Sequence, residues 1–185
     1  MSGTPPNHDH RRGHNGRVSH LPIDASRRPL PVTASDVDAA AARLAGVITE
    51  TPLQYNERLS AATGAEVWLK REDLQPVRSY KIRGAYNFIA QLSEEERAAG
   101  VIAASAGNHG QGVAMACAEL GIKGRIYVPS TTPRQKRDRM LTLGGAFVEL
   151  IVVGDSYDEA SAVAKQAAEE TGAVMVAAFD DARTI

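Results

Sequence analysis

Short β-branched runs alternate with helical segments over the second half of the chain, and this alternation restricts the fold more than any other feature. Strands are predicted at residues 101–104, 125–128, 147–152 and 174–177, and helices at 108–120, 133–143 and 156–171. Strands separated by helices need crossover connections, which produce a parallel sheet with helices on both faces. Ligands of such sheets bind at the carboxyl ends of the strands. We therefore expect an α/β fold with a parallel sheet and flanking helices.

The first half of the chain predicts smaller elements. Ser35 is the expected N-cap of a surface helix that runs to Ala45, since acidic residues follow it and small apolar residues form a stripe. A short helix is expected from Asn56 until Gly64 ends it. A strand is then predicted over residues 66–71, and a further helix after Lys81.

The heptapeptide SYKIRGA at residues 79–85 places Lys81 at the start of that helix. Lysine forms Schiff bases with aldehyde cofactors, so Lys81 is a candidate catalytic residue. A solvated lysine is the alternative, and the heptapeptide alone leaves both open. Arg83 and Lys70 are interpreted as surface charges, and the KRED run at residues 70–73 as a charged strand end.

The second motif, SAGNHGQG at residues 105–112, joins a predicted strand to a predicted helix. Small residues before a helix expose backbone N–H groups to an anion, which suits a carboxylate. Asn108 adds a neutral side chain that can donate to a phenolate-like oxygen. The alternatives are a plain strand-to-helix turn and, for His109, a capping or packing role.

Composition limits the partners and the compartment. A formal net charge of -1 argues against a nucleic-acid surface or an acidic membrane, and favours a small neutral or zwitterionic ligand. Cys117 is the only cysteine, which excludes an intrachain disulfide and suits a reducing cytoplasm. No apolar run approaches the roughly 20 residues that a bilayer span needs.

Residues 1–31 are rich in Pro, Gly, His, Arg and Ser and are predicted to be a disordered tail. The tail contains four histidines, His8, His10, His14 and His20. They have neither neighbouring cysteines nor helical spacing, so a solvated tail is favoured over a metal site.

Together the two motifs carry a family resemblance. KREDLQPVRSYKIRGA at residues 70–85 and SAGNHGQG resemble the threonine dehydratases (threonine ammonia-lyases), which belong to the tryptophan-synthase-like, fold type II class of pyridoxal phosphate enzymes. The likeness extends from about Val37 through the VPSTTPRQKRDRM segment that ends at Met140 to the closing FDDARTI. Sulfhydrylase relatives carry SVKDR and TSGNTG instead, so the residues after Lys81 and Asn108 favour the dehydratase branch. Arg78 and Tyr80 stand where many relatives carry His or Thr and Phe.

The resemblance implies roles for particular residues. Lys81 would form the Schiff base with pyridoxal 5'-phosphate, and Asn108 would contact the ring oxygen of this cofactor. The substrate-binding turn would consist of Ser105, Ala106, Gly107, Asn108 and His109.

The implied reaction is dehydration and deamination of L-threonine to 2-oxobutyrate and ammonia, the first step towards isoleucine. L-Serine would give pyruvate in the same pocket, since one missing methyl discriminates by only about 1 to 3 kcal/mol. A homo-oligomer in the cytoplasm is the expected state of the full-length protein.

The resemblance also predicts the domain organisation. We expect residues 32–70 to begin a larger domain, residues 71–155 to form a smaller cofactor domain, and residues 156–185 to return into the larger one. Relatives place a tetraglycine phosphate loop beyond the position of Ile185. We therefore expect this chain to be the N-terminal part of a dehydratase, with weak cofactor binding and little activity by itself.

Two other function classes stay open. The chain would be a catalytically inactive remnant that only binds an amino acid or a partner, or an α/β binding module whose motifs are coincidental. Two motifs in the right order and context disfavour the second alternative.

Overall fold

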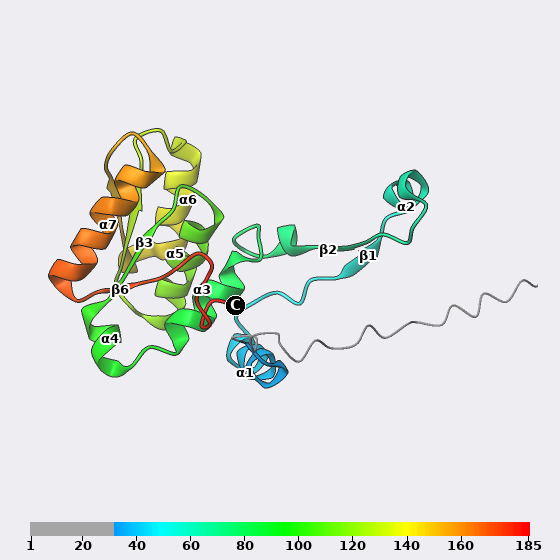
Figure 1. Cartoon of the computed structure of the whole chain (residues 1–185), viewed down its shortest axis with the longest axis horizontal. Coiled ribbons are helices and arrows are strands. Elements are labelled where there is room, and N and C mark those ends of the chain that lie inside the picture. The colour runs from blue at the N-terminus through cyan, green and yellow to red at the C-terminus, as the bar shows by residue number, and fades with distance from the viewer. Residues whose placement is uncertain (1–31) are drawn as a thin grey trace, which may run out of the picture. The chain divides into compact units, whose positions relative to one another are not determined.

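The computed structural model describes residues 32–185 (Figure 1). The disordered tail and the histidines without a metal, both predicted for residues 1–31, lie outside the described residues. The described residues belong to one compact unit. In this part of the chain no helix has both the length and the apolar character needed to cross a membrane. Among residues 32–185 no three His, Cys, Asp or Glu side chains gather as metal ligands do.

A four-stranded parallel sheet confirms the predicted α/β class. Its strands are β3 (Val101–Ala104), β4 (Gly124–Val128), β5 (Val148–Val152) and β6 (Val174–Met175), in the order β5-β4-β3-β6. The prediction for β3 is confirmed to the residue. β6 is shorter than predicted because only Val101 and Ile102 of β3 pair with it.

Helices cover both faces of this sheet, as Figure 1 shows. On one face lie α3 (Lys81–Ala90), α5 (Asn108–Leu120) and α6 (Arg134–Gly144), and on the other lies α7 (Tyr157–Thr171). The alternation of strand side chains divides the core accordingly: Val101 and Ala103 face the first layer, and Ile102 and Ala104 face α7.

The helix α3 is held to the core by an apolar stripe. Ile82, Ala85, Phe88 and Ile89 repeat with helical spacing and are fully buried. Burial of each large side chain contributes roughly 1.5 to 3 kcal/mol, so α3 and the lysine at its first position are fixed to the sheet layer.

Helix caps define the elements before and after α3. The N-cap of α1 (Ala34–Leu44) is Thr33, whose Oγ1 accepts from the amide of Asp36 at 3.4 Å while its own amide donates to the Asp36 carboxylate at 2.8 Å. The predicted N-cap, Ser35, is therefore wrong, because the three-residue spacing from Thr33 to Asp36 closes a capping box and leaves Ser35 inside the helix. The same box, with Ser93 and Glu96, starts α4 (Glu94–Ala99), which was not predicted.

β1 (Leu53–Tyr55) and β2 (Trp68–Lys70) pair as an antiparallel ribbon, and α2 (Glu57–Thr63) lies between them in the chain. Asn56 caps α2, and Gly64 ends it with a φ of 69°, as predicted. Two 3-10 turns, η1 (Glu72–Leu74) and η2 (Gly145–Phe147), complete the elements of residues 32–185.

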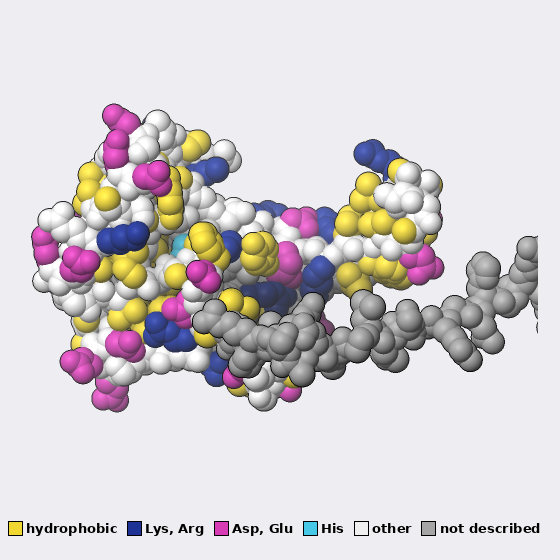
Figure 2. All heavy atoms as spheres, viewed as in Figure 1, with side chains coloured by type: hydrophobic (Ala, Val, Ile, Leu, Met, Phe, Trp, Pro, Cys, Tyr) yellow, Lys and Arg dark blue, Asp and Glu magenta, His cyan; other side chains and the backbone are white. Residues whose placement is uncertain are grey.

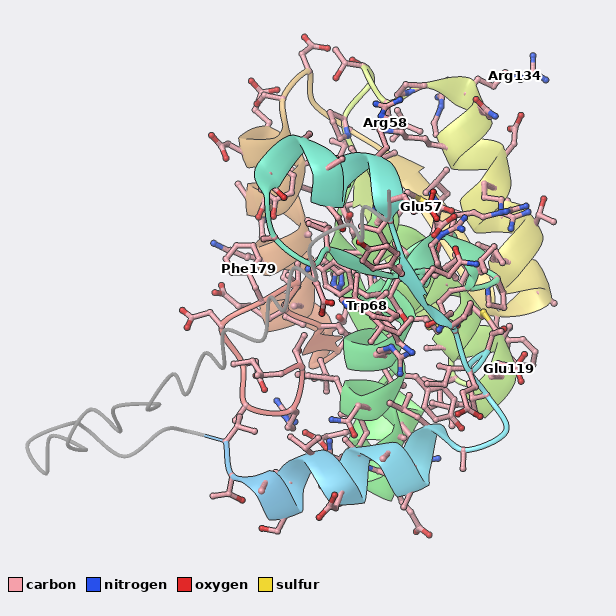
Figure 3. All side chains as sticks on the ribbon, turned by 90° about the vertical axis from the view of Figure 1, so that its right-hand side faces the viewer. Glu57, Arg58, Trp68, Glu119, Arg134 and Phe179 are labelled. Carbon is pink, nitrogen blue, oxygen red and sulfur yellow. The ribbon has the colours of Figure 1, made fainter. Side chains whose placement is uncertain are left out.

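The ribbon exposes large apolar side chains. Leu53, Tyr55 and Trp68 are 60%, 47% and 52% exposed, and Figure 2 shows hydrophobic side chains gathered over this part of the chain. The rings of Tyr55 and Trp68 meet edge to face, 5.2 Å apart. Figure 3 shows Trp68 below α2 and, at another edge, the exposed Phe179.

The three-part domain division stays a prediction. α7 and β6, which belong to residues 156–185, pack on the same sheet as β3, β4 and β5.

Candidate active site

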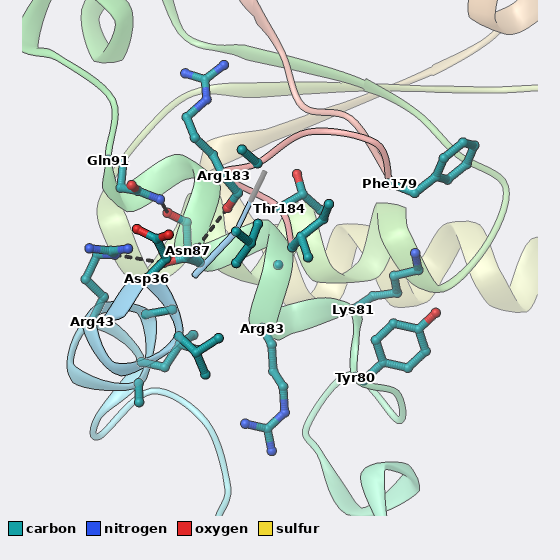
Figure 4. Close-up of a pocket in the computed structure, with 18 of the residues that line it drawn as sticks. Asp36, Arg43, Tyr80, Lys81, Arg83, Asn87, Gln91, Phe179, Arg183 and Thr184 are labelled. Atoms are coloured by element: carbon teal, nitrogen blue, oxygen red, sulfur yellow. Dashed lines mark hydrogen bonds between the residues drawn. The ribbon is translucent and has the colours of Figure 1, made fainter. Parts of the chain in front are cut away.

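Lys81 is the first residue of α3, and its amine faces the last segment of the chain. The Nζ atom donates to the carbonyl oxygen of Ala178 at 2.7 Å and lies 5.2 Å from the centre of the Tyr80 ring. Tyr80 precedes the helix without a side-chain cap. Figure 4 shows Lys81 between Tyr80 and Phe179. A helix start without a cap leaves its backbone amides available to a ligand.

The two sequence motifs lie against each other. A Cβ atom on Gly112 would stand 2.9 Å from the carbonyl oxygen of Lys81 and 3.2 Å from the amide nitrogen of Ile82. Only glycine permits this approach, since the atoms in the way are backbone. The last glycine of SAGNHGQG therefore brings α5 against the start of α3.

The turn between β3 and α5 is built as the sequence predicts. Gly107 precedes α5 without a side-chain cap, and its amide donates to the Ser105 hydroxyl at 3.2 Å. The first amides of α5 have no carbonyl of their own helix to donate to. Nothing lies within 4 Å of a Cβ built on Gly107, and the side chain of Asn108 is exposed. The turn thus has both donors and space for an anion.

His109 is buried and oriented by one hydrogen bond. Its Nε2 lies 2.9 Å from the carbonyl oxygen of Val176, and because a carbonyl only accepts, Nε2 carries the proton. Its Nδ1 is buried without a partner among the described residues. Burial lowers the pKa of His109, and the nearby charge of Lys81 lowers it further, against the opposite effect of the Val176 carbonyl. The imidazole is therefore neutral, with Nδ1 as a hydrogen-bond acceptor.

Lys81 and His109 line one cavity of about 650 Å³. α1, α3 and the segment 178–185 form the rest of its wall (Figure 4). The other predicted site residues, Ser105, Ala106, Gly107 and Asn108, are in the adjoining turn and do not line this cavity. The structure thus brings Lys81 and His109 together.

The closing segment of the chain crosses α3. The Asn87 side chain donates to the carbonyl oxygen of Arg183 at 2.8 Å, and the Arg183 guanidinium lies 4.0 Å from the centre of the Phe88 ring. A Cβ on Gly84 would collide with the carbonyl of Thr184, so Gly84 of the lysine motif serves this crossing. The sequence signal for these contacts was limited to the glycine.

Charged residues on both sides of Lys81 form a network that the sequence pattern did not indicate. The Arg83 guanidinium donates to both oxygens of Glu72 at 2.8 Å, and the Thr51 hydroxyl donates to the same carboxylate at 2.6 Å. The hydrogen bonds from Arg83 hold the pKa of Glu72 at about 2, against the effect of burial. Lys70 donates to the Thr51 carbonyl. The interpretation of Arg83 as a free surface charge is therefore wrong, because its guanidinium is paired with Glu72 in a partly buried network. Lys70 is exposed and is the last residue of β2, which agrees with a surface charge and with the charged strand end.

Most of the chain matches the sequence pattern of a known protein family. The pattern of the family described as pyridoxal-phosphate dependent enzyme matches residues 44–185. The chain belongs to this family. Both motifs lie within the matched residues, so the predicted family is confirmed.

Individual relatives agree with the family. The chain is 59% identical over 167 residues to the L-threonine dehydratase biosynthetic IlvA of Mycobacterium leprae, covering 89% of this chain and 39% of that protein. Among solved structures it is similar to the processed form of threonine deaminase isoform 2 from Solanum lycopersicum, with 38% identity, a TM-score of 0.71 and coverage of 82% of this chain and 45% of that one. Maize serine racemase gives 31% identity, a TM-score of 0.77 and coverage of 84% and 46%. The chain thus spans less than half the length of these relatives.

The residues present fit an aldehyde cofactor. Lys81 offers a primary amine at a cavity, and His109 offers a buried acceptor without a described partner. The open space at Gly107 would be filled by any side chain with a Cβ. These features match a family that holds its cofactor through a lysine.

Proposed function

We propose that this chain provides the lysine and the carboxylate-binding turn of an enzyme that converts L-threonine to 2-oxobutyrate and ammonia, the entry into isoleucine biosynthesis. The observation that carries the proposal is the close packing of the two motifs, which sets Lys81 beside the helix that begins at Asn108. The 59% identity to a threonine dehydratase supports the choice of substrate.

Pyridoxal phosphate, when bound, supplies an electron sink for the charge that develops at the substrate Cα. Lys81 would hold it through Nζ and move the proton at Cα, a role that requires release of the Ala178 carbonyl. Besides the guanidinium of Arg83, which stays protonated, the Nζ atom is the only basic nitrogen of α3 at this cavity.

The turn at residues 105–109 would orient the substrate. The Ser105 hydroxyl and the first amides of α5 suit a carboxylate, because a helix N-terminus favours negative charge. Asn108 would donate to the ring oxygen of the cofactor. Because His109 is neutral, it would add no positive charge beside the substrate carboxylate, which the backbone amides would bind. Its Nδ1 atom would add a hydrogen-bond acceptor.

L-Serine is proposed as a second substrate that yields pyruvate. The reason is chemical: the two amino acids differ by one methyl group, and both carry the β-hydroxyl that leaves. The likeness to a serine racemase agrees with a pocket that accepts serine.

We further propose that the whole protein works in the cytoplasm as a homo-oligomer. The sequence supports a reducing compartment, since Cys117 is its single cysteine and is buried as a free thiol without a partner for an intrachain disulfide. The competing proposal is a catalytically inactive remnant that binds an amino acid without converting it.

Borohydride trapping tests the role of Lys81. We expect borohydride reduction of the full-length protein loaded with pyridoxal phosphate to fix a pyridoxyl group at Lys81, identified by peptide mass spectrometry, and Lys81→Ala to abolish this label. Labelling at Lys70, Lys123 or Lys136 in place of Lys81 would contradict the assignment. Ketoacid release from L-threonine by the full-length protein separates an enzyme from a remnant, which would bind the amino acid without releasing ketoacid.

A further inference from the structure

We propose that Glu72 and Arg83 are positioning residues for Lys81: their bidentate ion pair fixes the rotation of the first turn of α3, and with it the direction of the Lys81 side chain. This inference rests on the proposed role of Lys81 as the lysine that holds the cofactor.

The pair is well placed to set the rotation of α3. Arg83 follows Lys81 by two residues, so the two side chains leave the helix about 200° apart. Figure 4 shows them leaving α3 in different directions. A restraint on Arg83 therefore acts from the far side of the helix and fixes where Lys81 points without touching it.

The ion pair has the geometry of a strong contact. Nε of Arg83 donates to one carboxylate oxygen of Glu72 and Nη2 to the other, each at 2.8 Å. The side chains are 33% and 16% exposed, so water competes with the pair only in part. Two parallel hydrogen bonds restrict orientation as well as distance, which a single contact does not.

Glu72 is itself held by residues from separate segments. Thr51 donates to its carboxylate at 2.6 Å. Gln75, which is fully buried, accepts from the amide of Thr49 at 3.0 Å and donates to its carbonyl at 2.8 Å. The carboxylate that receives Arg83 is thus part of a node that joins the segment before β1 to η1.

The start of α3 has no local cap, so the ion pair adds a restraint that the buried face of the helix does not supply. Its N-cap, Tyr80, makes no side-chain hydrogen bond, and Arg78 just before it has a left-handed φ of 61°. On the opposite side the buried side chains of Ile82 and Ala85 and the backbone contact at Gly112 hold the first turn against the core. Helices without caps fray at their first turn, which is where Lys81 lies.

The test compares trapping at Lys81 with trapping at Lys165, an exposed lysine of α7, in the same borohydride experiment. We expect Glu72→Ala and Arg83→Met to lower the ratio of label at Lys81 to label at Lys165 by roughly tenfold or more, since a misplacement of about 1 Å can cost about a hundredfold in rate. Arg83→Lys, which keeps the charge and loses the bidentate geometry, should lower the ratio less. The double variant Glu72→Arg with Arg83→Glu should restore part of the ratio of label at Lys81 to label at Lys165.

Asp73→Asn is the matched control. Asp73 pairs with Arg71 at 2.7 and 2.9 Å in the same segment but is exposed and does not contact α3, so the variant should keep the wild-type ratio. Glu72→Gln, of nearly the same shape, replaces Glu72→Ala if the alanine variant does not fold.

Unchanged Lys81 labelling in folded Glu72 and Arg83 variants would overturn the positioning role. Hydrogen exchange at the amides of residues 82–85 decides the same point without cofactor, with faster exchange expected in the variants and not in Asp73→Asn. Absence of label at Lys81 in the cofactor-loaded full-length protein would instead reject the proposed function, and the exchange result alone would then stand for or against the restraint.

Discussion

At the scale of single residues, Glu72 shows how a charge in the segment before Lys81 is used structurally. Its carboxylate satisfies Arg83, Thr51 and, more distantly, Gln75 at 3.5 Å. The charges of Glu72 and Arg83 therefore neutralise each other and are not free to bind a ligand. The role of this ion pair is to hold α3. Lys81 keeps the only amine of this helix.

Acid should weaken the fold through Glu72. Its pKa is about 2 in the folded chain and 4.5 ordinarily, so its stabilisation is complete above about pH 4.5 and is lost as the pH falls towards 2. We expect Glu72→Gln to lower the free energy of unfolding at pH 7 by on the order of 2 kcal/mol, allowing for partial exposure. Urea denaturation at pH 7, 5 and 3 should show the two proteins converging in acid. Curves that stay parallel would mean that Glu72 does not titrate with the fold.

At the scale of elements, the contact between α3 and α5 matters most, because it unites the two motifs. Because Gly112 has no side chain, the backbone of α3 at Lys81 packs where its Cβ would be. Gly110 likewise leaves room for the side chain of Met140 in α6. Gly107 has no neighbour to avoid. Three glycines in one motif therefore serve two purposes, helix packing at Gly110 and Gly112 and open space at Gly107.

Alanine substitutions should separate these purposes. At Gly112 the new Cβ would collide with the backbone of α3, at a cost of about 1 to 3 kcal/mol that the better helix propensity of alanine, about 1 kcal/mol, offsets only in part. We expect Gly112→Ala to lower the Tm, and Gly107→Ala to leave stability within about 1 kcal/mol while weakening amino-acid binding. Thermal denaturation measures the Tm of each variant, and titration calorimetry measures amino-acid binding. A lower Tm for Gly107→Ala together with weakened amino-acid binding for Gly112→Ala would instead place the open space at Gly112.

At the scale of the whole molecule, the apolar ribbon of β1 and β2 is the surface that most needs a partner. Two strands of three residues each are marginal by themselves, and their edges and apolar side chains are open. Surfaces of this kind favour association.

We expect the chain to self-associate through this ribbon. Trp68 is the only tryptophan, so its emission should shift to shorter wavelength as concentration rises. Trp68→Thr, which keeps a strand-forming residue, should weaken association roughly tenfold or more by sedimentation. Phe179→Ser removes an aromatic that is 73% exposed outside the ribbon and should change nothing. Equal effects of the two variants would place the contact elsewhere.

Much of the fold could be predicted because it is encoded locally. β3 and α5 have the predicted bounds, since a β-branched run, a small-residue turn and a helical stripe each act over a few residues. The N-cap of α1 was misplaced by two residues, because Thr33, Ser35 and Asp36 all have capping side chains and only the structure shows which pair closes the box.

The alternating strands and helices of the sheet, the family, and Lys81 and the turn at 105–109 as candidates could all be inferred from sequence, whereas α4 could not. Three contacts could be found only in the folded chain: Lys81 donates to the Ala178 carbonyl, His109 bonds to the Val176 carbonyl, and Arg83 forms an ion pair with Glu72. The first two contacts join residues 97 and 67 positions apart. Local propensity carries no information about such pairs, because they form only when parallel strands and their helices bring distant segments to one edge of the sheet.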